Sequence, residues 1–256
     1  MNTKEKRIFT RQVGMVVMVC VFCFFASVLH AQTTEKAKWE YPIKPGSDEW
    51  KATSYAKKVE LSQPPKELLN SWDTETLFNY CVDYPFNTVV MLFNNPSAGF
   101  MRAYEEATMW QEFIRRKDAV EVFANYFEDR PYKRMFERTD TEVRNEELFT
   151  MYFLEKLVSL TDFTDHLDSS LRRKLAAVIL QTHLSKKEYP DRVYGYPFNS
   201  SLSALVKILE SDKEVSANDE ISLSNFRRKT GNESFADDSM DSAILTKVFN
   251  YLNKQQ

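Results

Sequence analysis

The chain has 256 residues with 34 basic and 37 acidic side chains, and this acidic balance disfavours a nucleic-acid partner, which would require positive charge. Its five glycines lie far apart, so the glycine-rich loops of the usual nucleotide-binding sites are absent. The same scarcity of glycine disfavours β folds that depend on tight turns.

The N-terminus has the pattern of a signal peptide. Four basic residues up to Arg11 precede an apolar run from Met15 to Ala26, and the run fades towards Ala31. This pattern predicts a signal peptide at residues 1–31 and a secreted protein of the periplasm or cell surface. The apolar run is short for a membrane span, but residues 13–29 could cross a bilayer if tilted. An uncleaved membrane anchor therefore stays open as an alternative.

Cleavage after Ala31 would leave a mildly acidic chain with one thiol. Removing the leader's four basic residues and one glutamate leaves 30 basic and 36 acidic residues, a net charge of about −6. Only Cys81 would remain, so no intrachain disulfide can form and stability must come from a packed core. Cys81 lies among apolar residues, which predicts an inert, structural thiol.

Residues 32–46 form a polar, proline-containing lead-in to a helical domain at residues 47–256. The segment from Trp39 to Trp50 is too rich in aromatic residues for a free tail. We therefore expect it to dock onto the helical domain.

Apolar residues recur at helical spacing through most of the remaining chain. Asp73 and Asp168 have the positions of helix N-caps, and Thr139 with Glu142 forms a capping box. The pattern predicts an all-α, single domain of about eight or nine helices, arranged as an irregular bundle or a superhelical stack of helix pairs. The expected helices are 50–61, 65–71, 74–83, 97–114, 118–130, 139–157, 168–184, 201–210 and 244–252, with a short apolar segment at 88–94 and a loop at 211–237.

Three short motifs carry a resemblance to a known family. They are Tyr41-Pro42-x-x-Pro45-Gly46 followed by Trp50, Cys81-x-x-Tyr84-Pro85, and Phe93-Asn94-Asn95 followed by Gly99-Phe100. Together they resemble an uncharacterised family of exported helical bacterial proteins over residues 41–130. The resemblance implies export and a helical fold, and it implies no catalytic residue.

Acidic residues cluster with a histidine at one expected helix junction. Asp162, Asp165, His166 and Asp168 could in principle supply metal ligands, but helix capping alone explains acidic residues at such a turn. We therefore predict no metal and no cofactor. The chain has no G-x-S-x-G nucleophile motif, and adjacent glutamates such as Glu105 and Glu106 point apart on a helix.

Three basic triplets occur at 115–117, 172–174 and 227–229. They could bind an anion, but helix-end and surface charge is the simpler interpretation for an acidic, exported chain.

Aromatic residues provide the best candidate binding site. All four tryptophans lie in the first half of the mature chain, and rigid aromatic faces give contact area at low entropic cost. We predict ligand binding by Trp39, Tyr41 and Trp50, with a peptide, a glycan or another protein as the partner. The competing interpretation is that these residues only pin the N-terminal segment to the core. The predicted function is an exported, non-catalytic binding or scaffold protein, and the alternative is a secreted enzyme whose site no motif reveals.

Overall fold

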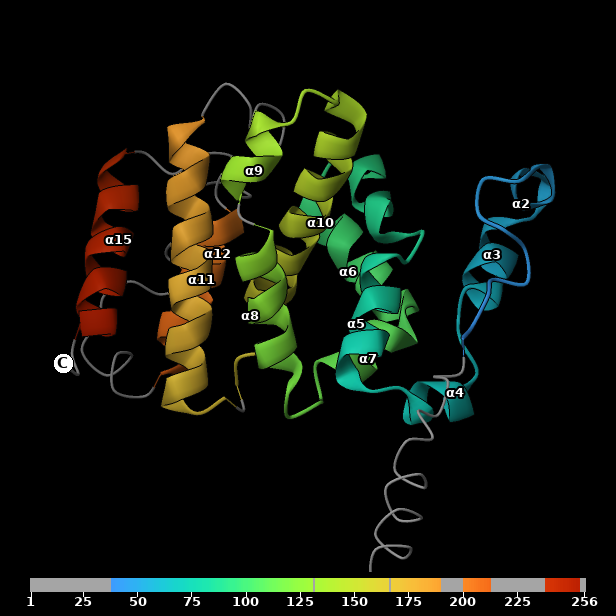
Figure 1. Cartoon of the computed structure of the whole chain (residues 1–256), viewed down its shortest axis with the longest axis horizontal. Helices are drawn as coiled ribbons and strands as arrows, with labels where there is room; N and C mark the ends of the chain where they lie inside the picture. The colour runs from blue at the N-terminus through green and yellow to red at the C-terminus, as the bar shows by residue number, and fades with distance from the viewer. Residues whose placement is uncertain (1–37, 131, 166, 190–199, 213–237, 254–256) are drawn as a thin grey trace, which may run out of the picture. The chain divides into compact units, whose positions relative to one another are not determined.

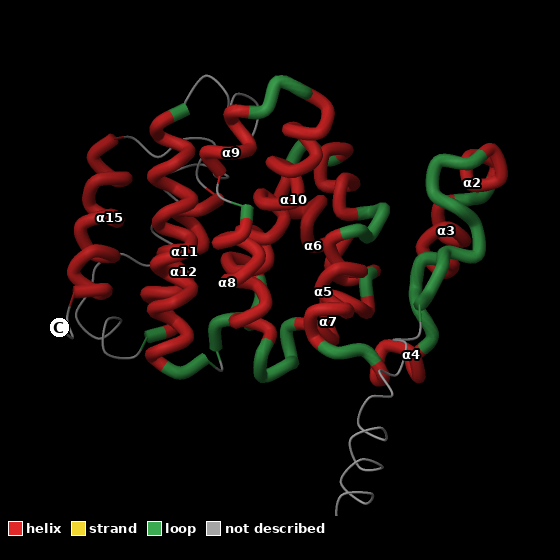
Figure 2. Tube along the Cα trace, in the orientation of Figure 1, coloured by secondary structure: helices red, strands yellow, loops and turns green. Residues whose placement is uncertain are grey.

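Helices form all the regular secondary structure in the residues that the computed structural model describes, which are 38–130, 132–165, 167–189, 200–212 and 238–253. No strand occurs within these ranges (Figure 2). The predicted all-α class is therefore confirmed. The expected signal peptide at 1–31 and residues 213–237 of the expected loop lie outside the described ranges.

Short helices build the N-terminal part of the domain. They are α2 (Asp48–Ala52), α3 (Tyr55–Leu61), α4 (Lys66–Ser71), α5 (Thr74–Val82) and the 3-10 helix η1 (Asn87–Leu92). Ser47 caps α2 and Ser54 caps α3, each accepting a hydrogen bond from a backbone N–H in the first turn. The cap at Ser54 divides the expected helix 50–61 into two. Asp73 caps α5 as predicted, accepting a hydrogen bond from the N–H of Thr76.

The middle of the chain contains α6 (Pro96–Glu106), α7 (Thr108–Phe113), α8 (Ala119–Asp129) and α9 (Tyr132–Glu137). One helix was expected over 97–114, but the chain breaks at Ala107. The side-chain oxygen of Gln63 accepts hydrogen bonds from the backbone N–H of Thr108 at 3.0 Å and from its hydroxyl at 2.9 Å. Because Gln63 lies 45 residues earlier, helical periodicity could not reveal this break.

Three long helices and a C-terminal helix complete the described chain. They are α10 (Thr141–Leu160), α11 (Ser169–Glu188), α12 (Ser200–Ser211) and α15 (Asp238–Asn253). Every residue from Met151 to Ser159 of α10 is buried, so α10 is central, as its all-round apolar pattern predicted. α10 packs against α12 and α6, while α11 packs against α8, α12 and α15 (Figure 1).

Gly99 permits a close approach between η1 and α6. A Cβ atom on Gly99 would lie 2.8 Å from both the Cα atom and the carbonyl oxygen of Val90. Backbone atoms cannot yield as a flexible side chain can, so only glycine fits at this crossing.

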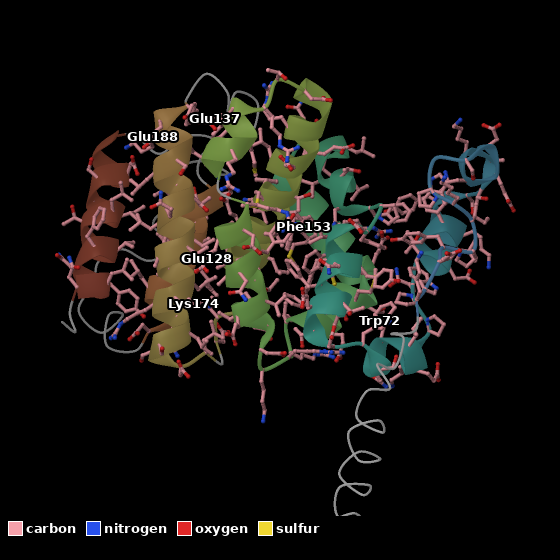
Figure 3. All side chains as sticks on the ribbon, in the orientation of Figure 1. Trp72, Glu128, Glu137, Phe153, Lys174 and Glu188 are labelled. Carbon is pink, nitrogen blue, oxygen red and sulfur yellow. The ribbon has the colours of Figure 1, made fainter. Side chains whose placement is uncertain are left out.

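Aromatic side chains dominate the core. Trp110 is fully buried, with its ring 5.3 Å from that of Phe153 on α10 and 5.9 Å from that of Phe113. Phe153 lies among the helices near the centre of Figure 3, whereas Glu128 and Glu188 lie at the surface. Within the described ranges, no helix combines the length and apolar character that crossing a membrane requires.

Candidate functional site

The segment Trp39–Trp50, here called the strap, docks onto the C-terminal half of α5. The backbone N–H of Trp39 donates to the Tyr80 hydroxyl at 2.9 Å, and that hydroxyl donates to the Trp39 carbonyl oxygen at 3.1 Å. The Tyr41 hydroxyl donates to the backbone carbonyl of Asp83 at 3.3 Å. The expected docking of this segment is therefore confirmed.

A tight turn redirects the strap into α2. The N–H of Ser47 donates to the carbonyl of Lys44 at 3.1 Å, and Gly46 has a φ of 84°. Proline and then a positive-φ glycine at the two central positions is the pattern of a type II turn. This turn leads into α2, where the ring of Trp50 lies 5.8 Å from that of Phe86.

Four partly exposed rings of this region, Trp39, Tyr41, Trp50 and Tyr55, form what we call the aromatic surface. Trp39 and Tyr41 contact each other edge to face, with ring centroids 4.6 Å apart. Trp50 and Tyr55 both contact Phe86, and Tyr55 is 41% exposed. No ring contact joins Trp50 to Trp39 or Tyr41, all three of which are described. Of the three predicted site residues, Trp39 and Tyr41 therefore form one pair on α5, while Trp50 lies apart from them and forms a second pair with Tyr55 on Phe86.

Polar groups hold the rings of the second pair. The Tyr55 hydroxyl donates to a Glu106 carboxylate oxygen at 2.6 Å. Partial burial and this hydrogen bond raise the pKa of Tyr55 to about 12, so the hydroxyl stays protonated. The ammonium of Lys58 lies over the ring of Trp50, 5.6 Å from its centroid. These contacts fix the orientation of both rings before any ligand arrives.

The structure also contains a buried polar cluster that sequence reasoning missed. The Lys186 ammonium of α11 lies 2.8 and 2.6 Å from the two carboxylate oxygens of Glu155 on α10. Ser200 of α12 donates to the same carboxylate and lies 3.4 Å from Lys186 Nζ. Burial lowers the pKa of Lys186, and the Glu155 carboxylate opposes this shift. Losing one member of such a pair costs about 3–5 kcal/mol, because the other charge stays buried.

A second chain of hydrogen bonds centres on His183. Its Nδ1 atom lies 2.9 Å from Ser201 Oγ, and its Nε2 atom lies 2.9 Å from Asp241 Oδ1. Burial lowers the pKa of His183 to about 4, so the ring is neutral near pH 7. The carboxylate can only accept, which assigns the ring proton to Nε2 and makes Nδ1 the acceptor for the Ser201 hydroxyl. Lys187 forms an ion pair with Asp241.

The hydrogen bonds of Ser201, His183 and Asp241 run in the same direction as those of a catalytic nucleophile, its general base and the carboxylate that orients the base. Ser201 and His183 are fully buried, however, and Asp241 is 6% exposed. A histidine with a pKa of about 4 is also a weak general base at neutral pH. The Lys186–Glu155–Ser200 cluster and the His183 hydrogen bonds together connect α10, α11, α12 and α15. They do not present a reactive hydroxyl to solvent.

One signal in the sequence pointed to this cluster. Leu175, Ile179, His183 and Lys186 follow one another at spacings of four, four and three, and all four are buried on α11. Polar residues that continue an apolar stripe must find partners inside the protein. The identity of the partners could not be read, since Ser201 and Asp241 lie 18 and 58 residues away from His183.

The predicted absence of a metal site stays a prediction. Asp168 caps α11 by accepting from the N–H of Leu171, and Asp165 pairs with Lys207 at 3.0 Å. Asp162, Asp165 and Lys207 line a polar hollow of about 450 Å³ at the end of α10. Among the described residues, no three histidine, cysteine or acidic side chains group as metal ligands, and His166 lies outside them.

Two of the basic triplets contact the fold itself. Arg116 donates to the carbonyls of Trp72 at 2.6 Å and Leu69 at 2.9 Å, so it caps the C-terminal end of α4. Arg172 donates to the carbonyl of Leu167 and lies 3.6 Å from Asp212. These contacts support the structural interpretation for both triplets. The third triplet, 227–229, lies outside the described ranges.

The thiol of Cys81 is fully buried on α5. Burial raises its pKa well above the ordinary range, and the nearby Arg116 opposes this only in part. The geometry agrees with the structural role expected from the sequence.

Comparisons of the chain with protein-family models, with curated proteins and with solved structures give no match. The resemblance to an exported helical family therefore stays an expectation, and the function has to be argued from the sites.

Proposed function

We propose that this chain is an exported, non-catalytic binding or scaffold protein of the periplasm or cell surface. In this proposal the aromatic surface contacts the partner, which is a peptide, a glycan or a region of another protein. The observation that carries it is that Trp39, Tyr41, Trp50 and Tyr55 keep solvent-facing area although hydrogen bonds and ring contacts fix them. Nucleic acid is disfavoured by charge, and a membrane is involved only if the N-terminal segment is retained.

Preorganisation explains why such rings suit binding. Ordering a flexible side chain at an interface costs about 0.5–1.5 kcal/mol, and a ring that is already fixed avoids most of that cost. Aromatic rings present flat apolar faces that stack on peptide side chains or on the apolar faces of sugars. Two supported pairs therefore offer contact area at low entropic cost.

The test is a selection experiment on the secreted chain. We would screen a random peptide library and a glycan array against the wild type and against a Trp50→Ala, Tyr55→Ala double variant. Loss of two anchor rings should weaken the selected ligands by about 10-fold or more. The matched control is Phe249→Ala, because Phe249 is 43% exposed on α15, far along the chain. Melting temperatures of all variants separate lost binding from lost folding.

Ligands that bind wild type and double variant equally would contradict the proposal. The alternative function is a secreted hydrolase that uses Ser201, which the polarity of the Ser201–His183–Asp241 chain favours.

A further inference from the structure

The C-terminal helix α15 is attached to α11 and α12 by a narrow apolar stripe with a polar contact at each end. Ile244, Val248 and Tyr251 are buried at spacings of four and three, which places them on one face of the helix. At one end the Tyr251 hydroxyl donates to a carboxylate oxygen of Asp212 at 3.0 Å. At the other end Asp241 contacts His183 and Lys187.

His183 is the hub of the second polar contact, because it is bonded to two other helices. It lies on α11. Its Nδ1 atom accepts a hydrogen bond from the Ser201 hydroxyl of α12, and its Nε2–H group donates one to Asp241 of α15. Both ring nitrogens are occupied and the side chain is fully buried. A change in the charge of this ring therefore acts on all three helices at once.

We infer that the Ser201–His183–Asp241 junction is an acid-sensitive latch, which holds α15 against α11 and α12 at neutral pH and releases it on acidification. Protonating the buried ring would add a positive charge to a site that excludes water. It would also turn Nδ1 from an acceptor into a donor and force the Ser201 hydroxyl to reverse. Releasing α15 lets the protonated ring reach solvent and removes both conflicts.

The charged groups around His183 determine how readily its ring is protonated. From α15, Asp241 favours the protonated ring, and from α11, Lys186 and Lys187 oppose it. Glu155 of α10 pairs with Lys186, while the contact from α12 is the uncharged Ser201. Burial is the largest influence, and the balance leaves the pKa of His183 at about 4.

The direction of the effect follows from proton linkage. With α15 released, the ring returns towards its ordinary pKa of 6.5, so between pH 6.5 and pH 4 the released state binds one more proton than the latched state. Stability of the latch is fully present above pH 6.5 and is lost as pH falls towards 4. At pH 4.5 the released population should rise about 60-fold relative to pH 7.

Hydrogen exchange of the full chain, expressed as protection factors at pH 7 and pH 4.5, tests the latch. Protection of α15 amides should fall by tens of fold more than protection of α8, which does not contact the junction. His183→Gln offers a donor and an acceptor but does not titrate here, so the excess loss in α15 should disappear.

A second variant covers the case in which His183→Gln fails to fold. Lys187→Met removes a cation that lowers the pKa of His183, so it should raise that pKa and reduce the excess loss of α15 protection at pH 4.5. The inference is overturned if α15 and α8 lose protection equally in the wild type. It is also overturned if His183→Gln keeps the full excess loss, or if Lys187→Met enlarges it.

Discussion

Ser201 shows how burial decides the chemistry of a side chain that geometry alone would call reactive. Its hydroxyl donates to a neutral histidine that in turn donates to a carboxylate. An exposed serine with these partners would be a candidate nucleophile. Here the serine and the histidine are fully buried, and the pKa of the base is about 4.

We therefore expect no reaction of Ser201 with a fluorophosphonate probe at pH 7 under native conditions. The physical reason is that the hydroxyl has no access to the probe and its base is too weak to activate it. Intact-mass spectrometry of wild type and Ser201→Ala after incubation provides the measurement. An adduct on the wild type that is missing from Ser201→Ala would favour the hydrolase alternative over the binding function.

The sequence could predict the hydrogen bonds of some residues but not those of others. Asp73 and Asp168 were identifiable as caps because a cap lies within three residues of the N–H group that it binds. The partners of His183 and Lys186 come from helices that only the fold brings together. The local sequence pattern therefore predicts helix caps, but it does not identify the partners that buried polar residues find on other helices.

Among the elements, the strap is joined to α5 through Tyr80. The Tyr80 hydroxyl is bonded to both the N–H and the carbonyl of Trp39, and the Tyr80 ring stacks on Trp72 at 4.2 Å. Trp72 directly follows α4, and Figure 3 shows it next to α5. One side chain therefore connects the strap to the first helices of the domain.

Tyr80→Phe should loosen the strap and leave the rest of the fold intact. Leaving partly buried polar groups without partners costs about 1–3 kcal/mol. Thermal unfolding should show a fall in melting temperature of roughly 2–12 °C for a domain of this size. Tyr55→Phe is the matched control, since its hydroxyl bond to Glu106 is exposed and should contribute little. Equal melting temperatures for wild type and Tyr80→Phe would show that the strap is not held in this way.

Element boundaries were predictable where local chemistry determines them. The starts of α5 and α11 follow their caps, and the proline at position 96 begins α6. The break at Ala107 could not be predicted, because the distant Gln63 side chain bonds to Thr108 beyond it. η1 is a 3-10 helix against which Gly99 packs, and its apolar letters alone did not specify that geometry.

In the whole molecule, composition, core packing and surface each limit what the protein can do. The composition excludes the common nucleotide sites, the helices bury an aromatic core, and the strap places fixed rings at the surface. The candidate residues Trp39, Tyr41 and Trp50 could be named from the sequence because aromatic residues in a proline-containing lead-in are unusual. Their arrangement with Tyr55 as two pairs of rings, on α5 and on Phe86, required the structure, because Tyr80 and Phe86 lie tens of residues away.

Acrylamide quenching of tryptophan fluorescence tests the binding claim most directly. Trp39 and Trp50 are partly exposed, whereas Trp72 is 3% exposed and Trp110 is fully buried. The free protein should therefore show a quenchable fraction that a Trp39→Phe, Trp50→Phe variant lacks. A saturating peptide or glycan from the selection should reduce quenching of the wild type to the level of that variant. Unchanged quenching with the ligand bound would contradict binding at the aromatic surface.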